Sequence, residues 1–477
     1  NSPSAHELTG AMIRKALLLL SLLLCGGPAA LANFQVSTEH LRLTFDSGGQ
    51  LQSAVSCFPS CSGDAVRIQQ FGDQGIVVFD RPGTGEWRRK ESRGSEYYEL
   101  QFQHPGGASV RWRIPATGYL LGLDLSGIEG MRLRSGESFR PRDAAGFGSW
   151  LEQARYVVFE DGGVRQIGFD ETEVTPVESS GWIGYRNRYW AMMALSPRPT
   201  ETILQAKEGG TDAELRIGEV AGAWSIYLGP IEPNVLKRAD PGLTGLLFAG
   251  LWFWLRWICF GMFHLLAWIQ AVVPSWGLAV MCLSAAVNIL MFPLSRIADR
   301  LQQQVQETEA RLAPELGCIK KKYKGEEQSV KILALYKTEG VHPLYSLKSM
   351  LGVVLVIPVF VGAFGMLAEN IHLLNAGFLW ITDLSRPDEL FRMPFQLPFL
   401  GAEFNLLPFL MTGLSLIAST LHNPPSLNRE LRVKQLRNMV LLAAAFFVLF
   451  YTFPASMVLY WTTNNLISVV RNLWARR

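Results

Sequence analysis

Polar side chains interrupt two of the long apolar stretches of this chain. Ser284 and Asn288 lie four residues apart in the stretch 277–294. Hydroxyl and carboxamide groups are neutral hydrogen-bond donors and acceptors, so inside a membrane they line a polar cavity or bond across a helix interface, for about 1 kcal/mol each. A second polar run, in the stretch 455–470, consists of Thr462, Thr463, Asn464 and Asn465.

The sequence lacks the common catalytic and nucleotide-binding motifs. It has no Gly-rich run ending in Gly-Lys-Ser/Thr, no His-Glu-x-x-His and no Gly-x-Ser-x-Gly. Cys259, Cys282 and Cys318 lie in or beside apolar stretches, and no His or Cys partner stands at metal-ligand spacing. We therefore predict that the protein is not an enzyme, has no catalytic residues and needs no metal or cofactor.

The carboxyl-terminal half contains five long apolar stretches. Each approaches the roughly 20 residues with which a helix crosses a ~30 Å hydrocarbon core, and a helix satisfies its own backbone there. Hydrophobic residues make up 49% of the chain and charged residues 18%, with a mean hydropathy of +0.16, so a large polar part must accompany the membrane part. The predicted spans are 277–294, 351–367, 406–421, 439–453 and 455–470.

The amino terminus is typical of a secretory signal. Arg14 and Lys15 precede an apolar run at 16–24, and Ala30-Leu31-Ala32 forms a small-residue cleavage pattern. Residues 12–32 are therefore predicted to be a signal peptide, with an uncleaved first membrane helix as the alternative. Residues 1–11 precede this signal and are read as an upstream extension or an expression remnant.

Residues 33–235 show short alternating runs separated by Gly, Pro, Asp and Ser, which predicts an all-β sandwich domain. Cys57 and Cys61 are close together in this domain, and a local disulfide between them is plausible in an oxidising compartment. Trp112, Trp182, Trp190 and Trp224 either pack in the core or offer stacking faces to a glycan. The predicted strands are 41–45, 76–79, 97–102, 109–114, 119–125, 156–159, 164–169, 214–220 and 224–228.

The segment 243–273 is also apolar, but we predict that it lies in the outer membrane interface. Trp252, Trp257 and Trp268 are typical interface residues, and Arg256 interrupts the run. If the segment crossed, the basic loop that follows the first span would lie outside, against the preference of Lys and Arg for the cytoplasm. The predicted protein thus has five core spans in residues 276–477 and a cytoplasmic carboxyl terminus, with six spans as the alternative.

The loop at 296–345 has its own helical pattern. Apolar residues recur at helical spacing on both sides of Gly325, which predicts a cytoplasmic helical hairpin, kinked at Pro314. It either connects two spans or forms a docking surface. Its candidate contact residues are Lys320, Lys321, Lys322 and Lys324.

Several of these stretches carry motifs of one family. Asn288-Ile289-Leu290-Met291-Phe292-Pro293-Leu294, Leu379-Trp380-Ile381-Thr382-Asp383-Leu384 and Phe453-Pro454-Ala455-Ser456-Met457, in this order, resemble the YidC/Oxa/Alb membrane insertases. The amino-terminal half is similar, more distantly, to the periplasmic domain of Gram-negative members, at Gly181-Trp182-Ile183 and Leu228-Gly229-Pro230.

The resemblance implies a multi-pass protein of the bacterial inner membrane, with a periplasmic β-supersandwich and an interfacial helix. Five core helices would enclose a hydrophilic groove without any cofactor. Most bacterial members have an arginine where this chain has Asn288, which puts the substrate range in doubt. The groove residues would be Asn288, Ser284, Thr462, Thr463, Asn464 and Asn465.

Two functions follow from the resemblance. The preferred one is an insertase or chaperone that acts on nascent or unfolded membrane proteins among membrane lipids, with the ribosome or the Sec translocon as further partners and no direct nucleic-acid contact. The alternative is an insertase-derived scaffold dedicated to one envelope protein complex, which the missing arginine favours.

Overall fold

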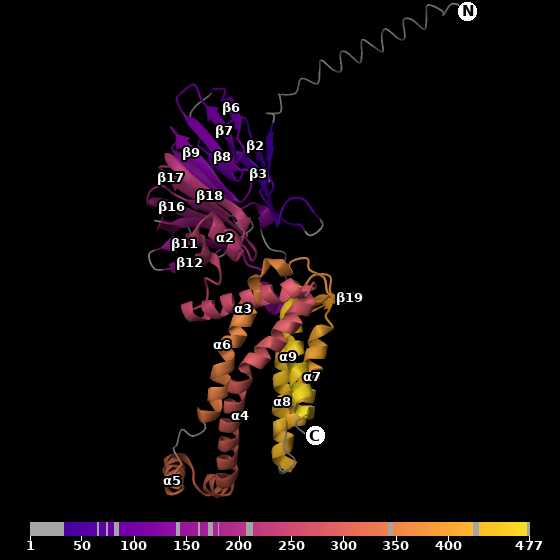
Figure 1. Ribbon diagram of the computed structural model, residues 1–477. Coiled ribbons are helices and arrows are strands. Elements are labelled where there is room, and N and C mark those ends of the chain that lie inside the picture. The colour runs from indigo at the N-terminus through magenta and orange to yellow at the C-terminus, as the bar shows by residue number, and fades with distance from the viewer. Residues whose placement is uncertain are drawn as a thin grey trace, which may run out of the picture.

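The computed structural model describes residues 33–474 except for 64–65, 73–74, 81–84, 140–143, 161–162, 170–174, 180, 207–212, 342–346 and 423–428. The predicted signal segment 12–32 and the extension before it lie outside the described residues. A β-domain stands at one end of a group of long helices, and a helical hairpin lies at the other end (Figure 1).

Two nine-stranded antiparallel sheets form the β-domain. The first has the order β1-β2-β3-β5-β10-β17-β16-β13 with β4 paired to β3, and the second has the order β12-β11-β14-β15-β18-β9-β8-β7-β6. The first comprises β1 (Phe34–Ser37), β2 (Leu41–Phe45), β3 (Leu51–Phe58), β4 (Arg67–Phe71), β5 (Val77–Phe79), β10 (Gly130–Arg134), β13 (Thr175–Ser179), β16 (Thr200–Ala206) and β17 (Ala213–Gly218). The second comprises β6 (Arg88–Arg93), β7 (Tyr97–Gln103), β8 (Ser109–Pro115), β9 (Leu120–Ser126), β11 (Arg155–Glu160), β12 (Gly163–Gly168), β14 (Trp182–Arg186), β15 (Trp190–Leu195) and β18 (Gly222–Pro230).

Alternating side chains of the two sheets build one core. Strands β2, β9 and β17 bury every second residue, as the predicted alternation requires. All nine predicted strands are present, and the sandwich prediction is confirmed. Strands β14 and β15 had no alternating signal because they are buried on both faces.

The four tryptophans considered for glycan stacking are buried in this core. The indole nitrogen of Trp112 donates to the Gly49 carbonyl oxygen at 2.8 Å, and that of Trp224 to the Val220 carbonyl oxygen at 2.7 Å. The hypothesis of exposed stacking faces is therefore wrong, since all four rings are buried. The same domain contains the Cys57–Cys61 disulfide, with an S–S distance of 2.09 Å.

The chain then leaves the β-domain through a short helix and enters the helical region. Glu232 caps the first of these helices by accepting a hydrogen bond from the Val235 amide at 2.7 Å. The elements are α2 (Pro233–Ala239), η3 (Pro241–Leu246), α3 (Phe253–Val272), α4 (Trp276–Lys322), α5 (Gly325–Thr338), α6 (Leu347–Glu369), η4 (Ile371–Leu373), β19 (Phe391–Leu397), β20 (Gly401–Phe404), α7 (Leu407–His422), α8 (Arg429–Phe450) and α9 (Ala455–Trp474).

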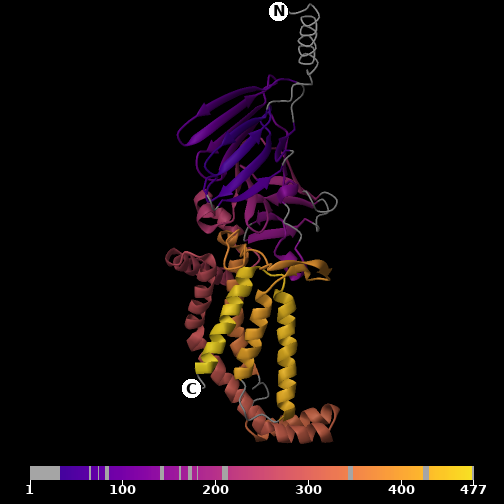
Figure 2. The same ribbon diagram turned by 90° about the vertical axis from the view of Figure 1, so that its right-hand side faces the viewer.

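Helix α4 differs from the prediction, because the first span and the first arm of the hairpin are one 47-residue helix. The boundary expected at residue 296 does not exist. Good helix formers such as Gln, Glu, Arg and Ala continue the helix beyond Pro293, and Pro314 also lies inside it. Near the far end of the molecule the chain turns crosswise into α5 (Figure 2).

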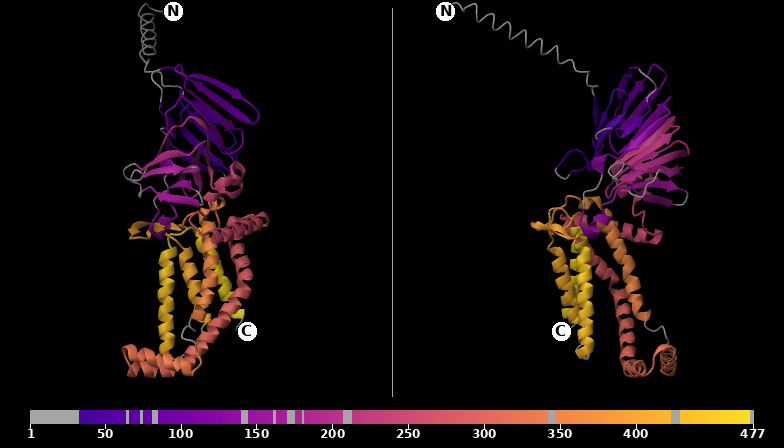
Figure 3. Two further views of the ribbon diagram at one scale, coloured as in Figure 1. Left: turned by 90° about the vertical axis from the view of Figure 1, so that its left-hand side faces the viewer. Right: turned by 180° about the vertical axis from the view of Figure 1, so that it is seen from behind.

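By length and composition, two helices among the described residues could each cross a membrane, Phe253–Val272 and Trp276–Val305. Shorter apolar helices are Val356–Glu369, Leu407–Leu421 and Leu436–Phe450. Helix α3, which is the first of these two candidate spans, lies crosswise to the other long helices in every view (Figure 3). Its inward positions Leu255, Cys259, Met262 and Leu266 recur at helical spacing and are buried, whereas Trp252, Trp257 and Trp268 are exposed.

Three buried arginines, Arg67, Arg186 and Arg188, join the β-domain to the helical region. Arg67 donates to the carbonyl oxygens of His372 and Leu374, at 2.8 and 2.9 Å, and its burial lowers its pKa. Arg186 pairs with Glu369 at 3.0 Å. Because such cations are costly to bury without partners, these contacts fix where the β-domain sits on the end of α6.

A polar bridge between α4 and α9 as the candidate functional site

Asn288 of α4 is hydrogen-bonded to α9. Its side-chain nitrogen donates to the Asn464 side-chain oxygen at 2.8 Å and to the Ser284 carbonyl oxygen, also at 2.8 Å. Ser284 is fully buried, and its hydroxyl donates to the Tyr460 carbonyl oxygen at 3.0 Å. Residues four apart share one helix face, so the pair on α4 meets a matching pair on α9.

The remaining predicted groove residues do not join this bridge. The hydroxyls of Thr462 and Thr463 donate to carbonyl oxygens of their own helix, those of Val458 and Leu459. Asn465 is buried and donates to the Met411 carbonyl oxygen of α7 at 3.0 Å. The structure thus brings together Ser284, Asn288 and Asn464, while Asn465 serves another interface.

Sequence reasoning missed a second member of the α7 interface. Asn472 donates to the Ala418 carbonyl oxygen of α7 at 3.0 Å. It stands seven residues after Asn465, as Ala418 does after Met411, so the two bonds repeat along one helix seam. The seven-residue spacing of Asn465 and Asn472 was the feature of the sequence that could have indicated this interface.

The helices around the bridge form an open arc. Helix α6 packs on α4, α4 on α9, α9 on α7, and α7 on α8. Near the β-domain the two ends of the arc meet at Trp461, whose ring is 5.1 Å from that of Phe360 in α6 and 6.0 Å from that of Phe450 in α8. The cavity among these rings is only about 10 Å³, so aromatic packing closes this end.

The bridge lies beyond this aromatic closure. Asn464 is about one turn further along α9 than Trp461, on the side away from the β-domain. Asn288 is only half-buried among these helices. The polar bridge is therefore accessible from the protein surface and lies behind an apolar barrier.

The sequence model of the family described as "60Kd inner membrane protein" matches residues 268–477. That range includes α4 with Asn288 and all of α9. The matched residues make up less than half of the chain.

Curated relatives similar to this chain carry the name "Membrane protein insertase YidC". The chain is 29% identical over 325 residues to the protein of Janthinobacterium sp. (strain Marseille). The alignment covers 64% of this chain and 55% of that relative. It is 31% identical over 254 residues to that of Syntrophobacter fumaroxidans, covering 53% of this chain and 43% of the relative. The chain spans about half the length of the curated relatives it matches.

A solved structure titled "Active YidC insertase crystal structure with the first transmembrane domain resolved" is also similar. It covers 96% of this chain and 99% of its own, at 18% sequence identity and a TM-score of 0.37. The matched family model and relatives are named for an inner-membrane protein and for insertases, in agreement with the prediction of a protein that is not an enzyme.

The turn between α4 and α5 carries the predicted lysines. Three of them form the last turn of α4, where cations complement the helix dipole, and the fourth precedes α5. All four are exposed, and Lys322 lies 5.7 Å from the Tyr323 ring centre. The four are Lys320, Lys321, Lys322 and Lys324.

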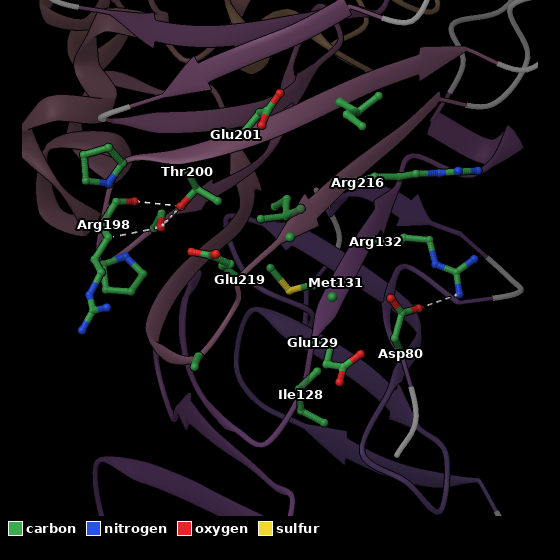
Figure 4. A pocket seen from close by; sticks show the side chains of 18 residues that line it. Asp80, Ile128, Glu129, Met131, Arg132, Arg198, Thr200, Glu201, Arg216 and Glu219 are labelled. Atoms are coloured by element: carbon green, nitrogen blue, oxygen red, sulfur yellow. Dashed lines mark hydrogen bonds and ion pairs between the residues drawn. The ribbon is translucent and has the colours of Figure 1, made fainter. Parts of the chain in front are cut away.

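A pocket of about 1210 Å³ lies in the β-domain (Figure 4). It is lined by β10, β16, β17 and adjoining loops, with charges of both signs. Asp80 and Arg132 form an ion pair there at 3.4 Å. No predicted site residue lines this pocket. In the described part of the chain, no three His, Cys, Asp or Glu side chains are placed to hold a metal ion.

Proposed function

We propose that this protein is a membrane protein insertase or chaperone of the bacterial inner membrane. Helices α4, α6, α7, α8 and α9 cross the bilayer, and α3 lies in its outer interface. The β-domain is periplasmic, while the α4–α5 turn and the carboxyl terminus face the cytoplasm. The exposed lysines at that turn support this orientation, because Lys and Arg favour the cytoplasmic side.

The observation that carries the proposal is the half-buried bridge between Asn288 and Asn464 beneath the aromatic closure. A hydrophilic segment loses water when it enters a bilayer, at a cost of several kcal/mol for each unpaired polar or charged group. A polar recess that opens to the cytoplasm and ends part-way through the membrane shortens this dry path. The apolar part of a client then leaves between α6 and α8 into lipid.

The geometry also favours a second candidate, a scaffold derived from an insertase. The Asn288 carboxamide nitrogen already donates to two partners, and its bond to Asn464 holds α4 and α9 together. The side chain is also neutral, at a position where most bacterial members of the resembled family carry an arginine. A scaffold of this kind would hold one envelope protein complex through the β-domain or the lysine-bearing turn.

Crosslinking separates the two functions. A photoreactive amino acid at position 288 should crosslink to nascent membrane proteins in cells that translate them, because clients pass through the recess. The matched control is position 289, whose isoleucine is exposed on the neighbouring face and should crosslink to lipid. Equal and low crosslinking to nascent chains at both positions would refute the recess.

Complementation gives the functional readout. We expect the chain to support growth of cells depleted of their insertase, and Asn288→Arg to widen the range of clients with acidic translocated segments. If both forms reach the membrane in equal amounts and neither supports growth, the scaffold is the correct function.

A further inference from the structure

A β-hairpin between α6 and α7 exposes an apolar surface that the core fold does not cover. Strands β19 and β20 pair as a separate two-stranded sheet, with Phe391 opposite Phe404 and Arg392 opposite Glu403. In the sequence of β19, Phe391, Met393 and Phe395 alternate with polar or proline residues, and the pairing register shifts between Arg392 and Leu397. Phe391 and Phe395 are 52% and 59% exposed.

Stacked rings connect this hairpin to the outer surface of the helices. The Phe391 and Phe404 rings stack with centres 4.8 Å apart, and Phe404 stacks on Phe409 of α7 at 5.3 Å. Phe409 in turn meets Phe447 of α8 edge to face at 4.8 Å. Phe409 is itself exposed, so the hairpin continues the apolar surface that α7 and α8 present outward.

The β-domain holds the hairpin in place from the other side. Phe147 of η2 (Gly146–Trp150) lies edge to face against Phe399 at the hairpin turn, with ring centres 4.9 Å apart. The Gly148 amide donates to the Thr452 hydroxyl oxygen at 3.0 Å, and a Cβ at Gly148 would collide with the Thr452 backbone. Only glycine allows this approach to the turn between α8 and α9, so η2 is fixed there and its Phe147 ring lies against the hairpin.

The hairpin and α3 lie at the same level and on opposite sides of the helix bundle (Figures 1, 2 and 3). Both run crosswise to the long helices, at the end next to the β-domain. Helix α3 exposes Trp252, Trp257 and Trp268, as the hairpin exposes phenylalanines. Aromatic rings with nearby Arg and Glu are the composition that proteins place at the boundary between lipid and water.

We propose that the hairpin β19–β20, together with η2, is a second interfacial anchor that embeds its aromatic face in the outer leaflet opposite α3. The partner is the lipid surface itself. With supports on two sides, the β-domain and the bundle cannot tilt freely relative to the bilayer. The proposal rests on the bilayer-crossing orientation proposed above but not on insertase activity.

The test uses the full chain in vesicles of phosphatidylethanolamine and phosphatidylglycerol, with single fluorescent labels. Cys25, Cys259, Cys282 and Cys318 are replaced by Ser or Ala, the Cys57–Cys61 disulfide is kept, and Phe395→Cys is labelled. We expect quenching by lipids brominated near the headgroup to exceed that by lipids brominated near the chain ends severalfold. Quenching by aqueous iodide should be weak.

Two matched labels make the outcome decisive. A label at Leu441→Cys, on the exposed apolar face of α8, should be quenched by deep bromines, and one at Tyr97→Cys, on β7, only by iodide. If these two behave as expected and the Phe395→Cys label responds to iodide as the Tyr97→Cys label does, the hairpin is free for another partner and the anchor is refuted. If the Leu441→Cys label is also water-exposed, the bilayer orientation fails, and the anchor with it.

Discussion

The guanidinium of Arg188 donates to the carbonyl oxygen of Ala368, at the last turn of α6, over 2.6 Å. Arg188 belongs to the β-domain and is buried, and it also contacts the Ser385 carbonyl oxygen at 2.9 Å and the Glu152 carboxylate at 2.6 Å. A cation at a helix carboxyl end is favoured by the helix dipole and satisfies carbonyl groups that the helix leaves unpaired. The β-domain is thus anchored on α6, the helix that follows α5.

Replacing this arginine should weaken the junction. Arg188→Met keeps much of the apolar stem but leaves buried carbonyl groups and Glu152 without their donor, at a cost on the order of 3 kcal/mol. We expect the midpoint of thermal unfolding of the full chain in detergent to fall by several degrees. Arg198→Met, on an exposed loop, is the control; similar midpoints for both variants would contradict the role of Arg188.

The junction should also weaken in acid. His372 stacks on Trp276 with ring centres 5.1 Å apart, and burial, with the nearby Arg67 cation, lowers its pKa to about 4. Because the unfolded histidine has a pKa near 6.5, the unfolded chain binds the proton first. The stabilisation is full above pH 6.5 and is lost as the pH falls toward 4.

Thermal unfolding midpoints across this pH range measure the effect. His372→Phe retains an aromatic ring and removes the titration, so its midpoint should depend less on pH. The pKa of His40 is also lowered by burial, and its share of the pH dependence should remain in the variant. Parallel pH profiles for the variant and the natural chain would exclude His372 as the cause.

The Asn288–Asn464 bond should appear as energetic coupling. Asn288→Ala and Asn464→Ala should each destabilise the helical region by about 1 kcal/mol, and the double variant by less than the sum, because both remove the same bond. Asn288→Ala combined with Asn472→Ala should be additive, since Asn472 bonds to α7. Unfolding in mixed micelles measures all of these variants. Additivity in the first pair would mean that the bond contributes nothing.

The proposed orientation has a direct test at the α4–α5 turn. In a background without other free cysteines, Lys322→Cys should resist an impermeant maleimide in cells with only the outer membrane opened, and should react after lysis. Tyr97→Cys on the β-domain should react in both conditions. Labelling of the Lys322→Cys protein before lysis would support the six-span alternative and reverse the proposed topology.

The sequence by itself determined the class of each half and the family of the second. Alternation with period two marked the half-buried strands, and long apolar stretches marked the helices, because each pattern reflects burial of one local element. It also indicated which polar residues could matter, Ser284, Asn288 and Asn464 among them.

Only the tertiary structure decided which of those residues meet. Thr462, Thr463, Asn464 and Asn465 are adjacent in sequence, yet helical rotation directs Asn464 to α4 and Asn465 to α7, and each threonine bonds to its own helix. The double-sided burial of β14 and β15, the single helix α4 and the buried arginines at the junction also depend on contacts between residues far apart in the chain. A local sequence pattern records how much of a residue is buried, but not which distant group buries it.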